Sequence, residues 1–142
     1  GYIVWRIGWL EYSSNFKKIC IAMNWLLVFI GGGMGSILRY FISQQLVFSK
    51  YFPWATLLSN LLATALLALL VVYLKSGDKP SWLLPLIGVG FCGGFSTFST
   101  FSAENVQLFE QGQWALLVVN ILLSVGAGFG VFLLVSRINT SH

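Results

Sequence analysis

The residues with the clearest potential chemistry are hydroxyls that alternate with phenylalanines in the second half of the chain. The run 95–103 reads Phe-Ser-Thr, Phe-Ser-Thr, Phe-Ser-Ala, a repeat of three residues. Residues three apart are neighbours on a helix, so the phenylalanines form one stripe and the hydroxyls form others. Such a helix either lines a polar pathway or packs with its serine and threonine side chains bonded back to their own turn.

Two glycines, Gly93 and Gly94, stand immediately before this repeat. Glycine weakens a helix, so the pair predicts a break in this segment. At membrane depth a broken helix is tolerated only where its backbone is buried in protein or lines a cavity. Carbonyl groups exposed at such breaks commonly bind cations.

A single amide, Asn60, stands in the leucine-rich segment 56–62. An amide in hydrocarbon is costly unless it finds partners. Its two N–H groups suit an anion, but the side chain could equally bond to a neighbouring helix and hold a bundle together. The sequence leaves both interpretations open.

Asn120 and Ser124 in the last apolar stretch are four residues apart, so they share one helix face. This polar stripe predicts either a pore lining or a contact within a helix bundle. Glycines four residues apart let helices approach closely. That spacing predicts tight packing or dimerisation, and it occurs at Gly31 and Gly35, at Gly90 and Gly94, and at Gly126 and Gly130.

Two charged residues, Arg39 and Glu104, are expected near the membrane. Arg39 lies near the end of the first apolar stretch and could reach the lipid headgroups. It could instead hold a positive potential in a vestibule and attract anions. Glu104 follows the phenylalanine repeat and is expected either at a pore mouth or at the membrane interface.

The composition places these polar groups in lipid. Of the 142 residues, 57% are hydrophobic and 8% are charged, with a mean hydropathy of +0.83, whereas a soluble domain carries about 25% charged residues. One span needs roughly 20 apolar residues, and apolar stretches cover about 24–47, 54–74, 82 onward and 114–135. We therefore expect an all-α integral membrane protein with four transmembrane helices and a break in the third.

The ends of these stretches carry the residues that membrane interfaces favour. A tryptophan, which prefers the headgroup level, opens each of them: Trp25, Trp54, Trp82 and Trp114. The eight Lys and Arg residues are scattered, mostly at span ends, which does not indicate a nucleic-acid partner. Their bias between the two sides is weak, which is compatible with insertion in both orientations or with one orientation set by a small excess.

The first 22 residues differ from the rest of the chain because they mix aromatic residues with charges. We expect an N-terminal extension over 1–22, which is either an amphipathic interfacial helix or sequence upstream of a natural start at Met23. A four-span domain is expected over 23–137 and a C-terminal tail over 138–142. Enzyme chemistry is not expected, because His142 is the only histidine and no catalytic set, metal cluster or phosphate-binding loop is apparent.

Three parts of the sequence together resemble the Fluc (CrcB) family of fluoride channels. These are the run 32–40, which reads Gly-Gly-Met-Gly-Ser-Ile-Leu-Arg-Tyr, Asn60, and the run 93–102. The resemblance covers about 23–137. It implies a passive, fluoride-selective channel that exports fluoride and lowers its cytoplasmic concentration. It also implies an antiparallel, dual-topology homodimer with two pores in the bacterial inner membrane.

The resemblance also implies roles for individual residues. A structural sodium ion on the dimer axis would be held by the backbone carbonyls of Gly93 and Ser96. Arg39 and Glu104 keep the vestibule positions expected from their places in the sequence. Asn120 and Gly128 depart from the hydroxyls expected on the polar track of the fourth span. The fluoride pore would be lined by Asn60, Thr97, Phe98, Thr100, Phe101 and Ser124.

Two other functions compete with this interpretation. A small four-span proton-coupled multidrug exporter needs a carboxylate inside the bundle, for which Glu104 is the only candidate. A structural assembly protein leaves the phenylalanine–hydroxyl repeat unexplained.

Overall fold

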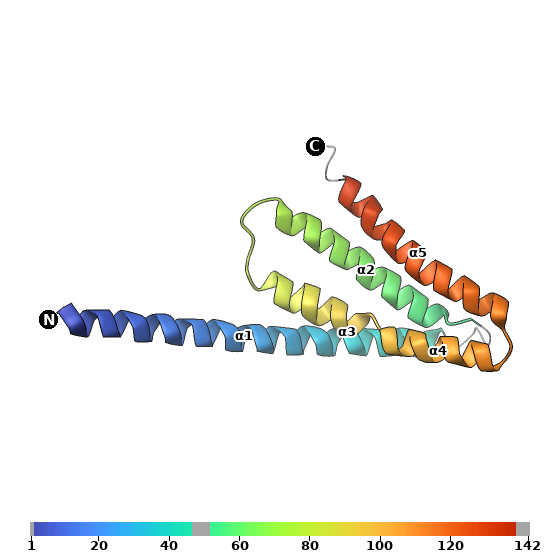
Figure 1. The fold of residues 1–142 in the computed structure, drawn as a ribbon, viewed down its shortest axis with the longest axis horizontal. Coiled ribbons are helices and arrows are strands. Elements are labelled where there is room, and N and C mark those ends of the chain that lie inside the picture. The colour runs from blue at the N-terminus through green and yellow to red at the C-terminus, as the bar shows by residue number, and fades with distance from the viewer. Residues whose placement is uncertain (1, 47–51, 139–142) are drawn as a thin grey trace.

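The computed structural model describes residues 2–46 and 52–138, with side chains over 20–46 and 52–137. All regular structure in these ranges is helical. The elements are α1 (Tyr2–Gln45), α2 (Trp54–Lys75), the π-helix η1 (Leu84–Cys92), α3 (Gly93–Phe95), α4 (Phe98–Glu110) and α5 (Trp114–Ile138). Together η1, α3 and α4 make up one interrupted third span (Figure 1).

Four stretches of the described chain are long and apolar enough to cross a membrane. They are Cys20–Gln45, Trp54–Lys75, Leu84–Glu110 and Trp114–Arg137. The shortest has 22 residues, which corresponds to about 33 Å of helix, enough for a hydrocarbon core of about 30 Å. The prediction of an all-α protein with four spans is confirmed.

Helix α1 is a continuous helix of 44 residues. Its N-terminal part extends beyond the rest of the molecule, with no break in the helix at Met23 (Figure 1). The boundary between an extension over 1–22 and a domain over 23–137 therefore stays a prediction from composition. The tail 138–142 lies outside the described residues except for Ile138, which ends α5.

Glycines allow α1 to cross the third span at close range. A Cβ atom on Gly31 would collide with the carbonyl oxygen of Leu86, and one on Gly94 would collide with that of Gly32. The packing predicted from the glycine spacing is confirmed at this crossing. In α5, by contrast, Gly126 and Gly130 have no described atom of another element within 4 Å of an added Cβ, so they contribute nothing to packing inside the chain.

The third span is broken, as predicted, but the break follows the glycine pair instead of coinciding with it. Gly93 has helical angles (φ −65°, ψ −38°), and α3 continues to Phe95. The extended residues are Ser96 (ψ 156°) and Thr97 (φ −151°, ψ 117°). The break expected in this segment is thus confirmed, and it begins at Ser96, two residues after Gly94. The lack of a side chain at Gly94 serves the close approach of α1 instead.

Candidate functional site

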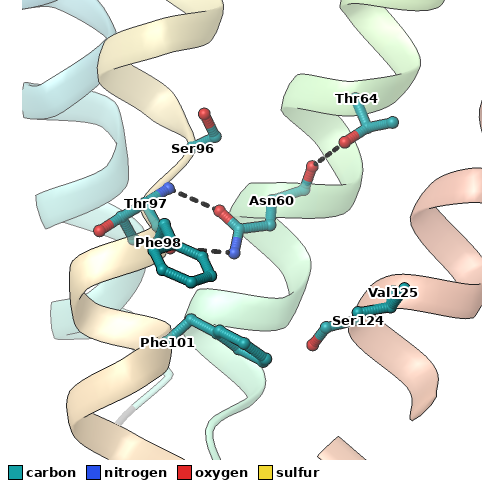
Figure 2. A pocket seen from close by; sticks show the side chains of 8 residues that line it. All are labelled: Asn60, Thr64, Ser96, Thr97, Phe98, Phe101, Ser124 and Val125. Atoms are coloured by element: carbon teal, nitrogen blue, oxygen red, sulfur yellow. Dashed lines mark hydrogen bonds between the residues drawn. The ribbon is translucent and has the colours of Figure 1, made fainter. Parts of the chain in front are cut away.

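A pocket of about 260 Å³ lies beside the break, between the third span, α2 and α5 (Figure 2). It gathers side chains from segments that are far apart in sequence. Its lining consists of Asn60, Thr64, Ser96, Thr97, Phe98, Phe101, Ser124 and Val125. None of these eight side chains is charged, so the pocket is a neutral, partly polar surface within an apolar protein.

The side chain of Asn60 forms two hydrogen bonds with the backbone of Thr97. Asn60 Oδ1 accepts from Thr97 N at 2.7 Å, and Asn60 Nδ2 donates to Thr97 O at 3.2 Å. In a continuous α-helix Thr97 N would donate to the carbonyl of Gly93. The amide therefore stabilises the break, as the interhelical alternative predicted. An amide nitrogen carries two N–H groups, and the second N–H of Asn60 has no partner among the described residues.

Two phenylalanine rings form the side of the pocket that belongs to α4. The centroids of Phe98 and Phe101 lie 6.0 Å apart, and both rings point from α4 toward α2 and α5 (Figure 2). Phe98 is 80% exposed, whereas Ser96 and Thr97 beside it are half-buried. The rim of an aromatic ring carries positive partial charge, so these rings can present favourable edges to an anion.

Thr97 and Thr100 start helix α4. Thr97 Oγ1 accepts a hydrogen bond from Thr100 N at 3.2 Å, which makes Thr97 the N-cap residue. The hydroxyl of Thr97 also donates to Thr100 Oγ1 at 3.1 Å. Thr97 lines the pocket, whereas Thr100 does not. Two further hydroxyls bond back to their own turns, as the packing alternative predicted: Ser96 to Cys92 O and Ser102 to Phe98 O.

The predicted polar stripe of the last span is divided between two roles. Asn120 is 1% exposed and donates to Asn105 Oδ1 at 2.9 Å, so it is a contact within the bundle. Ser124 donates to Asn120 Oδ1 at 3.4 Å and also lines the pocket. The bundle contact therefore occurs at Asn120, whereas the pore lining stays a prediction for Ser124, which lines the pocket.

Some residues of this region were missed by the sequence analysis. Thr64 lines the pocket and donates to the carbonyl of Asn60 at 2.7 Å; its spacing of four residues from Asn60 was the available signal. Val125 and Asn105 carried no such signal. Val125 is one of many apolar residues in α5 and does not stand out in the sequence. Asn105 reaches Asn120 because α4 folds against α5.

The two charged residues predicted for vestibules bond to neighbouring spans. Arg39 Nε donates to the carbonyl of Gly94 at 3.1 Å, and Ser36 Oγ donates to the same oxygen at 3.4 Å. Glu104 Oε1 accepts from Thr56 Oγ1 at 2.7 Å. Neither charged side chain lines the pocket. Arg39 thus contacts the third span just before the break.

Gly93 and Ser96, the residues predicted to hold sodium, line a second pocket of about 150 Å³. Because Thr97 N bonds to Asn60, the carbonyl of Gly93 has lost the donor that a continuous helix would supply. Oxygen atoms are the ligands that hard cations prefer, so this donor type fits sodium. The described residues contain no group of three or more His, Cys, Asp or Glu side chains suited to a metal.

Comparison with known proteins extends over most of the chain. Residues 26–136 match the family described as CrcB-like protein, Camphor Resistance (CrcB). A protein of Pyrococcus horikoshii named fluoride-specific ion channel FluC is 43% identical over 117 residues, which are 78% of this chain and 94% of that protein. A protein of the same name from Coxiella burnetii is 38% identical over 121 residues, which are 78% of this chain and 97% of that protein.

These relatives are named as ion channels and not as enzymes, in agreement with the prediction from the sequence. A match of this extent, together with four apolar spans and a break in the third, shows that the chain is a multi-pass membrane protein of the CrcB family.

Proposed function

We propose that this chain forms a passive, fluoride-selective ion channel that exports fluoride and lowers its cytoplasmic concentration. The observation that carries the proposal is the neutral pocket beside the break. Asn60, Ser124 and the two rings of Phe98 and Phe101 converge there from three spans. The names of the relatives support the same ion.

The chemistry of the pocket suits a small, strongly hydrated anion. Dehydration of fluoride must be offset by donors, and the second N–H of Asn60, which has no partner among the described residues, is one such donor in the pocket. The hydroxyls of Thr97 and Ser124 donate to Thr100 and Asn120 in this arrangement, so each would have to turn its proton to reach an ion. The ring edges of Phe98 and Phe101 add positive partial charge. A pathway lined by such groups attracts the ion without a fixed charge that would trap it, and conduction requires binding weak enough for the ion to leave.

The pathway as a whole extends beyond the pocket. Arg39 would raise the local positive potential on the approach to the break, and Glu104 and Thr100 would lie along the same route on the α4 side. The side-chain position of Arg39 against Gly94 supports a place close to the pathway. A passive channel suffices for export, because fluoride enters cells as neutral HF, dissociates inside and leaves down its gradient.

The working unit in this proposal is an antiparallel, dual-topology homodimer with two pores. Three features of the single chain support a partner: the 80% exposure of Phe98, the unfilled space beside Gly126 and Gly130, and the weak charge bias of the sequence. A second copy would cover surface that the single chain leaves open.

A structural sodium ion on the dimer axis is part of the same proposal. The carbonyl oxygens of Gly93 and Ser96 would hold it, and when bound the ion supplies positive charge that fixes the two broken helices to each other. The residues themselves prepare the site: Asn60 removes the helical donor of Gly93, and Arg39 occupies the neighbouring carbonyl of Gly94. The bacterial inner membrane stays a prediction for the location.

Anion flux from proteoliposomes tests the function directly. Vesicles containing the purified protein and loaded with potassium fluoride should release fluoride when a potassium ionophore is added, and vesicles loaded with chloride should not. Comparable release of both anions would contradict a fluoride-selective channel. Absence of fluoride release together with uptake of a cationic drug driven by a proton gradient would instead favour the multidrug exporter.

A further inference from the structure

A chain of side-chain hydrogen bonds runs from Asn105 on α4 through Asn120 to Ser124 on α5, which lines the pocket. Asn120 Nδ2 donates to Asn105 Oδ1 at 2.9 Å, and Ser124 Oγ donates to Asn120 Oδ1 at 3.4 Å. Of these three residues only Ser124 lines the pocket, and its hydroxyl faces the pocket beside Phe101 (Figure 2). Among the described residues, the hydrogen bonds of the two asparagines therefore reach the pocket through Ser124.

We infer that Asn105 and Asn120 are positioning residues that set the direction of the Ser124 hydroxyl proton. This inference rests on the proposed fluoride channel. It adds that two side chains outside the pocket determine whether Ser124 can donate its proton to the ion. In the arrangement described, the proton points at Asn120 Oδ1, so Ser124 turns only lone pairs toward the pocket. An anion there needs the proton instead.

The amide chain has a second arrangement with the same number of internal bonds. A side-chain amide is nearly symmetric in shape, and a half-turn exchanges its donor and its acceptor. When both amides turn, Asn105 Nδ2 donates to Asn120 Oδ1, and Asn120 Nδ2 donates to Ser124 Oγ. The proton of Ser124 is then released toward the pocket, and an anion that binds it stabilises the turned arrangement.

The distances and the burial favour this exchange. The bond from Ser124 to Asn120 is 3.4 Å long, whereas a typical O–H···O bond is about 2.7–2.8 Å, so little is lost when it breaks. A hydrogen bond to an ionised acceptor is stronger than a neutral one. Because Asn120 is 1% exposed, water cannot replace its partners, and the state of Asn105 decides which end of the Asn120 amide faces Ser124.

Asn105→Asp separates this role from simple packing. A carboxylate accepts but does not donate, so it holds Asn120 Nδ2 and keeps Asn120 Oδ1 on Ser124. We expect fluoride flux to fall about tenfold, the effect of one hydrogen bond to a charged group. The matched control is Gln107→Glu, which makes the same chemical change at an exposed position of α4 and should leave flux unchanged.

A double variant shows whether the effect passes through Ser124. Asn105→Asp combined with Ser124→Ala should conduct no worse than Ser124→Ala alone, because the proton in question is already gone. Additive losses would overturn the inference, as would wild-type flux in a monodisperse Asn105→Asp protein. Absence of fluoride flux in the wild-type protein would refute the channel itself, which is a distinguishable result.

A measurement on the wild-type protein covers the case in which Asn105→Asp does not fold. Side-chain amide signals of Asn105 and Asn120 in nuclear magnetic resonance spectra should shift on addition of sodium fluoride and not on addition of sodium chloride. Neither residue lines the pocket, so a purely structural role predicts unchanged signals. Unchanged signals in a protein that conducts fluoride would overturn the inference.

Discussion

The side chain of Asn60 is bonded to both backbone polar groups of Thr97, at 2.7 Å from its nitrogen and 3.2 Å from its oxygen. Asn60 of α2 thus supplies hydrogen bonds to Thr97 in place of those that a continuous third helix would supply at the break. The same amide keeps an N–H group for the pocket. Structural support of the break and the proposed contact with fluoride therefore fall to the same residue.

Asn60→Leu should remove both functions. Loss of the two bonds leaves Thr97 N and O without partners in a part-buried position, which should lower the free energy of unfolding by about 1–3 kcal/mol and abolish fluoride flux. Thermal unfolding and proteoliposome flux measure the two effects. Thr64→Val serves as the control for stability, because among the described residues the Thr64 hydroxyl bonds only within its own helix; an equal loss of stability in both variants would contradict a special role for Asn60 at the break.

Phe98→Leu should lose most fluoride flux at little cost in stability. The ring of Phe98 is 80% exposed in the single chain, so leucine removes a favourable ring edge but hardly any internal packing. Phe101→Leu should have the same effect on flux. Flux measurements on monodisperse protein check both variants. Normal flux in both would show that the two rings serve packing and do not contact the ion.

Phe95→Leu is the internal control for that experiment and should behave in the opposite way. Phe95 is 3% exposed and packs against Phe91, with the ring centroids 5.6 Å apart. A smaller side chain there leaves a cavity, so we expect a loss of about 1 kcal/mol in stability with conduction preserved in the folded fraction. A flux defect as severe as that of Phe98→Leu would remove the distinction between pore and core rings.

Gly94→Ala and Gly93→Ala should differ sharply although the residues are adjacent. A methyl group on Gly94 collides with the backbone of Gly32, whereas one on Gly93 has no described atom within 4 Å. Gly94→Ala should therefore fail to yield monodisperse protein, and Gly93→Ala should purify normally. Size-exclusion chromatography measures whether each variant is monodisperse. If the two variants behave alike, the close approach of α1 to Gly94 does not limit folding.

Ser96→Ala should retain the dependence of flux on sodium. The hydroxyl of Ser96 donates to Cys92 O at 2.8 Å, so it is directed into its own helix, and the proposed ligand is the backbone carbonyl. Flux assays with sodium replaced by a large organic cation test this. If Ser96→Ala conducts equally with and without sodium while the wild type does not, the hydroxyl and not the carbonyl is the ligand.

A cysteine added after His142 should be labelled from both faces of the membrane. The weak charge bias predicts insertion in both orientations, so half of the C-termini should react with an impermeant reagent in sealed vesicles. The background should carry Cys20→Ser and Cys92→Ala, which removes both native thiols. Complete labelling from one face would establish a single orientation and contradict the dual-topology dimer.

The sequence by itself determined the class of the protein and the kinds of residue at its site. Hydropathy is a local property, so stretches of some 20 apolar residues define membrane spans without knowledge of their neighbours. Glycine spacing likewise predicted close packing of helices, which occurs where α1 crosses the third span. Five of the six pore residues given with the family resemblance line one pocket.

Only the tertiary structure decided how those residues are used. The break lies at Ser96 and Thr97 because its backbone is bonded by Asn60, 37 residues away in the chain. Arg39 contacts Gly94 from 55 residues away, and Asn105 bonds Asn120 across two helices. In an apolar protein each polar group must find a partner, and which partner it finds depends on how the spans pack, which local sequence does not encode.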